Sequence, residues 1–316
     1  MKQFTFLLFL FGIFIHLKVD AQRTKPRVII STDIGGDDPD DFQSMVHLLM
    51  YANELNIEGL VSSPPGEGRK EHILEALDAY AQDFEKLRKH GNFPSPEYLN
   101  SVTKQGLTEV QSTPKPSSEV SEGANWIIEK ARQKNDQPLY LLVWGSMTDV
   151  AQALHFVPDI KENIRVYMIG SWNTRMDSLA RNYVFEHHPD LWLIENNTTF
   201  RGMYVGGDQS DDFGNTSFVE KYVKDHGALG ELFNQKKKDI KMGDTPSVLY
   251  LLNGDPDQPE TGSWGGRFLR TDHGPNYFTD LSDPKFIENN RPGAKTVNVW
   301  RKDYLTDWAT RMKWLK

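Results

Sequence analysis

The chain has 316 residues and a formal net charge of −8, and 38% of its residues are hydrophobic and 25% charged. This composition is ordinary for a soluble globular protein, and the negative charge argues against a nucleic acid polymer as partner. Because cysteine is absent, disulfide bonds, thiol catalysis and cysteine-ligated zinc are excluded. The one dense basic run, Lys236 to Lys238, is short and adjoins Asp239, and we interpret it as a solvated helix end.

The N-terminal segment has the features of a secretory signal peptide. Lys2 precedes an apolar stretch from Phe4 to Leu17, and the small residues Val19 and Ala21 indicate a cleavage site. The apolar stretch is shorter than the roughly 20 residues that span a bilayer. We therefore expect removal of residues 1–21, no stable membrane insertion afterwards, and a secreted or periplasmic location. An uncleaved anchor is the alternative.

The mature chain, residues 22–316, alternates strand and helix signals. The apolar run Arg27–Asp33 lacks a clean alternation and suits a strand buried on both faces. A glycine pair ends this run, and Asp38 followed by Pro39 resembles a helix N-cap and a first helical position. Further expected helices cover 42–50, 71–90 and 147–156, and further expected strands cover 57–63, 139–144 and 165–170.

This alternation predicts one α/β domain with a mostly parallel central sheet flanked by helices. Sites in such sheets lie beyond the carboxyl ends of the strands. We therefore expect convergence of the segments that follow Asp33, Ser63, Trp144 and Gly170. The stretch 92–122, rich in Pro, Ser and Thr, is expected to be a surface excursion, and 254–292 a long loop.

The strongest local signal is the acidic segment Ser31–Asp41, which carries five aspartates after the first expected strand. Carboxylates held close together raise one another's pKa unless a cation neutralises them, and calcium or magnesium prefers such oxygen ligands. An EF-hand is disfavoured because its alternating spacing is absent, and a phosphate cradle because Asp37 and Asp38 would face the anion. Ser31 stands where an aspartyl-phosphate phosphatase needs Asp. A solvated loop in which Asp38 caps the helix is the simplest alternative.

The same segment resembles the nucleoside hydrolase signature D-x-D-P-G-x-D-D, with matches at Asp33, Gly35, Asp37 and Asp38 and departures at Ser31 and Ile34. More narrowly, Asp33–Asp41 and the later Trp264–Phe268 are similar to the nucleoside-hydrolase-like domain of the cellulose-binding Sde182 proteins. The resemblance extends through most of the mature chain and implies a nucleoside hydrolase-like fold.

The resemblance also implies a calcium site. Leu141–Val150 resembles the family segment L-V-x-x-G-x-L-T-N-I, whose residue before the glycine, here Trp144, gives a main-chain carbonyl to the metal. Met242–Tyr250 resembles the family helix start H-D-x-x-A-V-A, which makes Asp244 the last metal carboxylate. Without the resemblance, Asp244 would be a helix N-cap and Trp144 a buried strand end. The implied calcium ligands are Asp33, Asp38, Asp244 and the Trp144 carbonyl.

Roles toward the substrate are implied as well. Asp33 is expected to act as the base for a calcium-bound water, and Asp37 to hydrogen-bond a sugar hydroxyl. Asn173 and Asn182 fall where the family holds the ribose. The family's acidic ribose contact is replaced by Ala180, which leaves the sugar undetermined.

Activation of the leaving group must differ from the family pattern, or be absent, because Gly243 replaces the His that protonates a departing purine. Candidate acids near the expected site are His187, His188, Asp272 and His273. Candidate stacking residues are Trp172, Trp264 and Tyr277. The simpler interpretations are a surface histidine pair and packing aromatics.

The sequence therefore predicts a secreted, calcium-dependent hydrolase of N-glycosidic bonds acting on a small-molecule nucleoside. The first alternative is a hydrolase of another extracellular glycoside or glycoconjugate with the same site. The second is a noncatalytic calcium-dependent carbohydrate-binding protein, which Asp33 argues against because binding alone needs no base. A homo-oligomer is left open by the sequence.

Overall fold

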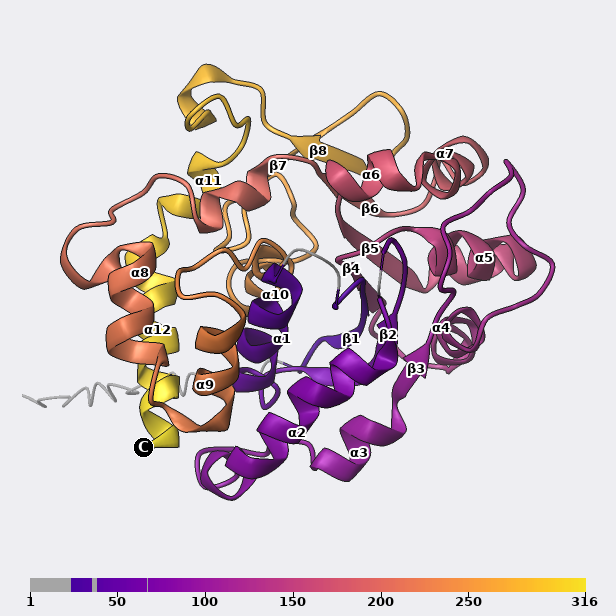
Figure 1. Ribbon diagram of the computed structural model, residues 1–316. Helices are drawn as coiled ribbons and strands as arrows, with labels where there is room; N and C mark the ends of the chain where they lie inside the picture. Colours follow the sequence, from indigo (N-terminus) through magenta and orange to yellow (C-terminus); the bar gives the residue numbers. More distant parts are fainter. Residues whose placement is uncertain (1–23, 36–38, 67) are drawn as a thin grey trace, which may run out of the picture.

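The computed structural model describes residues 24–35, 39–66 and 68–316. Within these ranges, eight strands form one sheet in the order β3-β2-β1-β4-β5-β6-β8-β7 (Figure 1). Neighbouring strands are parallel except β7 and β8. The strands are β1 (Arg27–Thr32), β2 (Asn56–Ser62), β3 (Thr103–Gln105), β4 (Leu139–Val143), β5 (Ile164–Ile169), β6 (Leu193–Asn196), β7 (Phe268–Arg270) and β8 (Tyr277–Asp280). The expected α/β fold with a mostly parallel sheet is confirmed.

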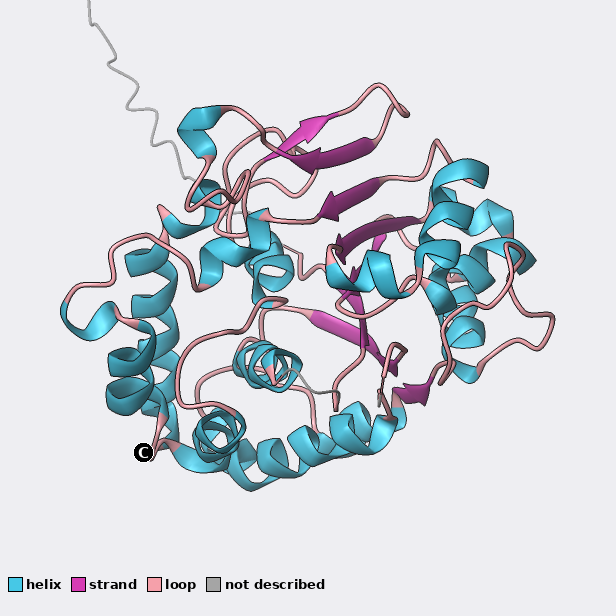
Figure 2. Ribbon diagram, turned by 45° about the horizontal axis from the view of Figure 1, so that its top comes forward, coloured by secondary structure: helices cyan, strands magenta, loops and turns pink. Residues whose placement is uncertain are grey.

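Helices cover both faces of the sheet (Figure 2). One face packs against α1 (Asp40–Met50), α2 (Lys70–Leu87), α9 (Gly227–Lys236), α10 (Thr245–Leu252) and α12 (Arg301–Met312). The other packs against α4 (Glu122–Arg132), α5 (Thr148–Phe156) and α7 (Ser178–His187). Shorter elements are α3 (Pro96–Ser101), α6 (Trp172–Met176), α8 (Asn215–Phe218), α11 (Lys295–Asn298), the 3-10 helices η1 (Pro158–Glu162), η2 (Thr199–Met203), η3 (Asp211–Phe213), η5 (Pro284–Phe286) and η6 (Lys313–Leu315), and the π-helix η4 (Val219–Val223).

The sheet divides the hydrophobic core into two layers. Val28 and Ile30 of β1 pack with α1 and α2, whereas Ile29 packs with α4 and α5. All three side chains are fully buried, because successive residues of a strand point to opposite faces and both faces are covered. This explains the continuous apolar run in the sequence.

The four strands that the sequence indicated are found within one residue of their expected bounds. The other four strands, β3, β6, β7 and β8, have only three or four residues each, too few for a periodic pattern. The stretch 92–122 is accordingly more than a surface excursion, because α3 lies in it and β3 extends the edge of the sheet. The N-cap of α1 is Pro39 rather than Asp38, which lies outside the described residues.

The expected signal peptide, residues 1–21, also lies outside the described part of the chain and stays a prediction. Over the described ranges, no helix combines the length and the apolar character that crossing a bilayer requires.

Candidate active site

The carboxyl ends of the parallel strands surround one cavity of about 1070 Å³. Its lining comes from the segments after β1, β2, β4, β5 and β6 and from the starts of α1 and α10. The expected convergence of these segments is confirmed. A cavity at this edge of a parallel sheet is where such folds place their ligands.

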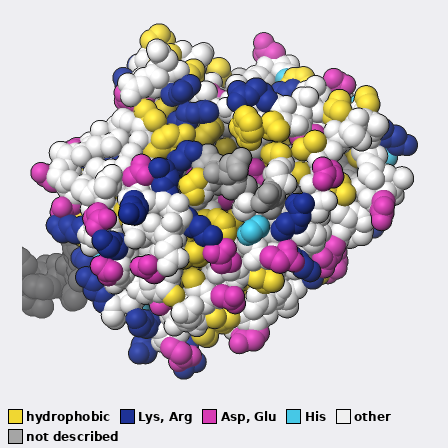
Figure 3. Space-filling model, viewed as in Figure 1, with side chains coloured by type: hydrophobic (Ala, Val, Ile, Leu, Met, Phe, Trp, Pro, Cys, Tyr) yellow, Lys and Arg dark blue, Asp and Glu magenta, His cyan; other side chains and the backbone are white. Residues whose placement is uncertain are grey.

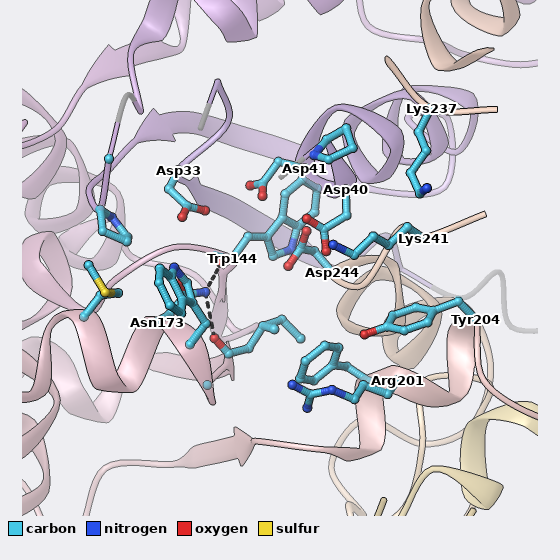
Figure 4. Close-up of a pocket in the computed structure, with 18 of the residues that line it drawn as sticks. Asp33, Asp40, Asp41, Trp144, Asn173, Arg201, Tyr204, Lys237, Lys241 and Asp244 are labelled. Atoms are coloured by element: carbon cyan, nitrogen blue, oxygen red, sulfur yellow. Dashed lines mark hydrogen bonds between the residues drawn. The ribbon is translucent and has the colours of Figure 1, made fainter. Parts of the chain in front are cut away.

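One wall of the cavity, called here the acidic wall, consists of Asp33, Asp40, Asp41 and Asp244, whose carboxylates face one another in Figure 4. Asp33 directly follows β1, and Asp40 and Asp41 form the first turn of α1. The hydroxyl of Thr32, the last residue of β1, donates a hydrogen bond to the Asp41 carboxylate. This bond ties the start of the helix to the end of the strand.

Asp244 reaches the acidic wall from a distant part of the sequence. It occupies the N-cap position of α10, but its side chain makes no capping hydrogen bond. The residue is only 3% exposed. One of its carboxylate oxygens lies within 4.8 Å of carboxylate oxygens of Asp40 and Asp41. The N-cap interpretation therefore fits the backbone of Asp244 but not its side chain, which faces the cavity.

Trp144, directly after β4, connects this wall to the rest of the cavity. Its buried indole Nε1 donates to Ser247 Oγ at 2.8 Å, and that hydroxyl donates to the Asp244 carbonyl at 2.7 Å. The Trp144 carbonyl accepts a hydrogen bond from Asn173 Nδ2, which also donates to the Ile169 carbonyl at 3.1 Å. Trp144 thus fixes the starts of α10 and α6 relative to β4.

The carboxylates of the acidic wall repel one another because they carry the same charge. Burial, and then the charges of Asp41 and Asp40, raise the pKa of Asp33 well above its usual value. Oxygen ligands of one calcium ion lie about 2.3–2.6 Å from it and hence no more than about 5 Å apart. The cluster of Asp40, Asp41 and Asp244 meets this limit. The donor set therefore fits a hard divalent ion.

A second wall, called here the basic wall, contributes Arg201, Lys236, Lys237 and Lys241, with the aromatic residues Trp172, Phe200 and Tyr204 nearby. Figure 3 shows Lys and Arg side chains next to hydrophobic ones over the region of α6 and β7. In Figure 4, Lys241 points toward Asp40 and Asp244. The run Lys236–Lys238 does mark a helix end, but its first two residues line the cavity and are not simply solvated.

The 3-10 helix η2 carries Arg201 and is held from below by a buried carboxylate. Asp280, the last residue of β8, accepts hydrogen bonds of 2.8 to 3.2 Å from the backbone N–H groups of residues 197–199. Burial raises the pKa of Asp280, and these hydrogen bonds oppose that rise. Arg201 itself donates to the Asn197 carbonyl at 2.7 Å and to Ser171 Oγ at 3.0 Å.

Four of the predicted site residues line the cavity, namely Asp33, Trp144, Asn173 and Asp244. Asp37 and Asp38 lie outside the described residues, so their roles stay predictions. Asn182 is exposed on α7 and is not part of the lining, and its Oδ1 accepts a hydrogen bond of 3.2 Å from Arg181. A role for Asn182 in holding the sugar stays a prediction that this geometry does not support.

The candidate leaving-group acids lie elsewhere. His187 stacks on Tyr183 with ring centroids 4.5 Å apart, and His273 stacks on Phe185 with centroids 3.4 Å apart. His188 is the buried C-cap residue of α7. Among the described residues, no histidine lines the cavity. Of the candidate stacking residues, Trp172 lines it, whereas Trp264 and Tyr277 do not.

A side chain at position 243 would crowd the acidic wall. A Cβ atom at this position would lie 2.7 Å from Asp40 Oδ2 and 3.3 Å from the Phe200 ring. A histidine here would therefore displace part of the acidic wall. The absence of a histidine at position 243 is what allows Asp40 to approach the backbone this closely.

Sequence reasoning assigned no role to Asp40, Asp41 or Arg201. The spacing of the signature selected the earlier pair, Asp37–Asp38, although Asp40 and Asp41 are the pair that begins the apolar helix. Their position at the start of the helix was the sequence signal that could have identified them as site residues. Arg201 follows a four-residue strand and belongs to no motif, so no signal pointed to it.

A family model described as "Cellulose-binding Sde182, nucleoside hydrolase-like domain" matches residues 27–268. The chain belongs to this family. The resemblance to the Sde182 proteins that the sequence indicated is thus confirmed, and the match extends from β1 to the start of β7. A comparison with curated proteins gave no match.

Solved structures share the fold. A nucleoside hydrolase-related hypothetical protein from Saccharophagus degradans, associated with carbohydrate metabolism, is 26% identical, with a TM-score of 0.72 over 92% of this chain and 72% of its own. The inosine-uridine preferring nucleoside hydrolase from Bacillus anthracis is 16% identical, with a TM-score of 0.54 over 90% and 99%. The effector XopQ complexed with adenosine diphosphate ribose is 11% identical, with a TM-score of 0.56 over 93% and 94%. The Sde182-like chain therefore has a nucleoside hydrolase-like fold within a carbohydrate-associated family.

Proposed function

We propose that this Sde182-like protein is a calcium-dependent hydrolase that cleaves the N-glycosidic bond of a small-molecule nucleoside. The observation that carries the proposal is the acidic wall, where Asp33, Asp40, Asp41 and Asp244 from separate elements meet at the carboxyl ends of the sheet. The nucleoside hydrolase-like fold supports the reaction class.

The proposed calcium ligands are carboxylate oxygens of Asp33, Asp40, Asp41 and Asp244 together with the Trp144 carbonyl. The Trp144 carbonyl has a second lone pair beside the one that Asn173 uses. The pair Asp40–Asp41 is added to the proposed ligands because it lies in the cavity. Asp38, outside the described residues, stays a predicted ligand. When bound, such an ion orients a water molecule and lowers its pKa.

Asp33 is the proposed base. It accepts a proton as the water oxygen attacks the anomeric carbon, and the electron pair of the C–N bond passes to the departing base. A general base must lie within reach of the attacking water, and Asp33 lines the cavity beside the other carboxylates of the acidic wall. Because Gly243 replaces the family His and no histidine of the described residues lines the cavity, substrates whose leaving group is stable as an anion are expected to react fastest.

A second candidate is hydrolysis of another extracellular glycoside by the same residues. The family description names cellulose binding, and the Saccharophagus protein is associated with carbohydrate metabolism. Trp172, 56% exposed at the cavity, offers a face on which either a sugar ring or a nucleobase can stack. The two candidates differ in the leaving group and not in the site.

A hydrolysis screen tests these proposals. The purified protein is incubated with nucleosides, p-nitrophenyl riboside and p-nitrophenyl hexosides, with calcium or with a chelator. The variants are Asp33→Asn and, as a matched control on an exposed loop, Asp136→Asn. Calcium-dependent release of nucleobase that only Asp33→Asn removes supports the main proposal. Turnover of hexosides alone selects the second candidate, and sugar binding without any turnover identifies a noncatalytic binding protein.

We also propose that the protein is exported and that residues 1–21 are removed. The support is the charged, apolar and small-residue order of this segment. N-terminal sequencing of the protein recovered from expressing cells tests it. A chain beginning at Gln22 is expected, and a membrane-bound chain beginning at Met1 would support the anchor alternative.

A further inference from the structure

We infer that the substrate of this cavity carries an anionic group, a phosphate or a carboxylate, and that Arg201 binds it. The inference rests on the proposed function, because it concerns the same cavity and defines the substrate class. The acidic wall repels anions, so the charged group lies at Arg201 while the glycosidic bond faces Asp33. Arg201 thereby becomes a specificity-determining residue.

Arg201 forms no ion pair with a described residue, although Asp280 beneath η2 attracts its charge from farther away. Its guanidinium is half-buried in the cavity lining, and no carboxylate of the described residues lies within 4.0 Å of it. Its two hydrogen-bond acceptors, the Asn197 carbonyl and Ser171 Oγ, are neutral. They fix the guanidinium in place and leave other N–H donors of its five for a ligand. A partly buried cation without an anion is costly unless a ligand supplies one.

The other cations of the basic wall differ from Arg201 in this respect. Lys236 Nζ lies 2.7 Å from Glu75, and Lys237 Nζ lies 2.6 Å from Asp239. Lys241 points toward the acidic wall in Figure 4. The Arg201 guanidinium lies 4.4 Å from the centroid of the Phe200 ring, whereas Lys236 Nζ lies over the Phe42 ring of α1.

Further positive charge gathers at the same place. Burial lowers the pKa of Arg201, and the charges of Arg291 and Arg175 act in the same direction, whereas Tyr204 and Asp280 oppose them. Arg175 lies over Trp172, 5.7 Å from the centroid of its ring. Arg175 and Arg291 are exposed. Three guanidinium groups that repel one another at the edge of a cavity form a field that attracts anions.

The chemistry of arginine favours phosphate and carboxylate. A guanidinium presents planar, paired N–H donors that match both anions, and such charge-assisted bonds are stronger than neutral ones. Trp172, which is exposed at the cavity, provides an aromatic face next to this position for the ring of the same molecule. A nucleotide-like compound or a uronic acid glycoside meets both requirements.

Calorimetric titration with matched probes tests the inference. The probes are adenosine 5′-monophosphate against adenosine, and p-nitrophenyl glucuronide against p-nitrophenyl glucoside. All proteins carry Asp33→Asn, so that turnover does not disturb the titration. Arg201→Gln removes the charge, Arg201→Lys keeps it, and Arg270→Gln is the control, because Arg270 is exposed on β7 and pairs with Glu260.

At least one anionic probe is expected to bind about 10- to 100-fold more tightly than its neutral partner. The preference should disappear in Arg201→Gln and persist in Arg201→Lys and in the control. A preference for the monophosphate identifies phosphate as the anion, and one for the glucuronide identifies carboxylate. If Arg201→Gln does not fold, loss of the preference between 50 and 500 mM salt in Arg201→Lys supports the inference.

Equal affinity within both pairs, no binding of either anionic probe, or a preference that survives Arg201→Gln in folded protein would overturn the inference. The proposed function is judged separately, by turnover of the protein with Asp33 intact. A preference for the anionic probes without turnover would contradict the proposed hydrolysis and support an anionic ligand. Turnover without such a preference would support the hydrolysis and contradict the anionic ligand.

Discussion

The two walls of the cavity arise in different ways. The acidic wall is built from residues that directly follow β1 or begin α1 and α10, and all of these elements belong to the buried core. The basic wall is built from the 3-10 helix η2, the end of α9 and the loop that follows it. The first wall follows from the shared architecture, because strand ends in a parallel sheet must meet. The second depends on short elements that can change between relatives, so it is the wall expected to set substrate choice.

The largest expected effect comes from Asp33→Asn, which tests whether the acidic wall carries out hydrolysis independently of anion binding at the basic wall. Asp33→Asn should lower the hydrolysis rate by about 10²- to 10⁴-fold, because a general base contributes that much, and should leave anion affinity unchanged. Initial rates on p-nitrophenyl riboside and titration with the anionic probes measure the two effects. A loss of anion affinity equal to the loss of rate would show that the walls do not act independently.

The scaffold outside both walls provides the next test. Asp149 on α5 is buried, and desolvation raises its pKa to about 6 from 3.8. Because the folded form binds this proton more tightly, the contribution of Asp149 to the free energy of unfolding grows as pH falls from 6 to 4 and is lost as pH rises through 6. By linkage the change amounts to at most about 3 kcal/mol.

Asp149→Asn keeps an acceptor for the Ser121 hydroxyl and the Leu107 N–H and removes the titration. Its stability relative to the unsubstituted protein should therefore be higher at pH 7.5 than at pH 4, in urea denaturation. The catalytic rate should not change. A stability difference that is the same at both pH values would contradict the assignment.

A smaller effect is expected where β8 supports the basic wall. Asp280→Asn places an amide against the backbone N–H groups of residues 197–199, and the loss of charge-assisted hydrogen bonds should lower stability by about 2 kcal/mol. Affinity for anionic probes should fall because Arg201 loses its fixed position, while calcium affinity should hold. Calcium affinity falling as much as anion affinity would mean that η2 also shapes the acidic wall.

The smallest expected effect tests the connection through Trp144. Trp144→Phe removes the hydrogen bond from Nε1 to Ser247, which itself contributes about 1 kcal/mol to stability. Calcium affinity should fall, because Ser247 holds the start of α10 and hence Asp244. Ser101→Ala, which removes an exposed hydroxyl far from the cavity, is the control. Unchanged calcium affinity in Trp144→Phe would show that α10 is held without this bond.

The same contrast explains what the sequence could predict. Long apolar runs predicted β1, β2, β4 and β5. The family resemblance then assigned Asp33, Trp144 and Asn173, in the segments after three of these strands, to the site. The acidic segment indicated a cation site. Deciding which of its five aspartates bind the cation, however, requires knowing where α1 begins. That boundary depends on how the loop packs, and sequence patterns locate helix ends poorly.

The basic wall could not be predicted for a different reason. Arg201 follows β6, whose four residues, Leu-Ile-Glu-Asn, are too few to show a period, and it is held by Asp280 from a distant strand. Lys236 and Lys237 looked like a solvated run, because only the packing of α9 beside α1 brings them to the cavity. Such long-range contacts leave no local trace in the sequence.

Calcium binding by the chelator-treated protein is the most direct test of the central claim. Isothermal titration calorimetry should detect one calcium ion per chain, and Asp41→Asn and Asp244→Asn should each weaken its affinity by at least about 10-fold, whereas Asp136→Asn should not. No calcium binding by the unsubstituted protein, or equal affinity in all three variants, would contradict the claim that these aspartates form a metal site.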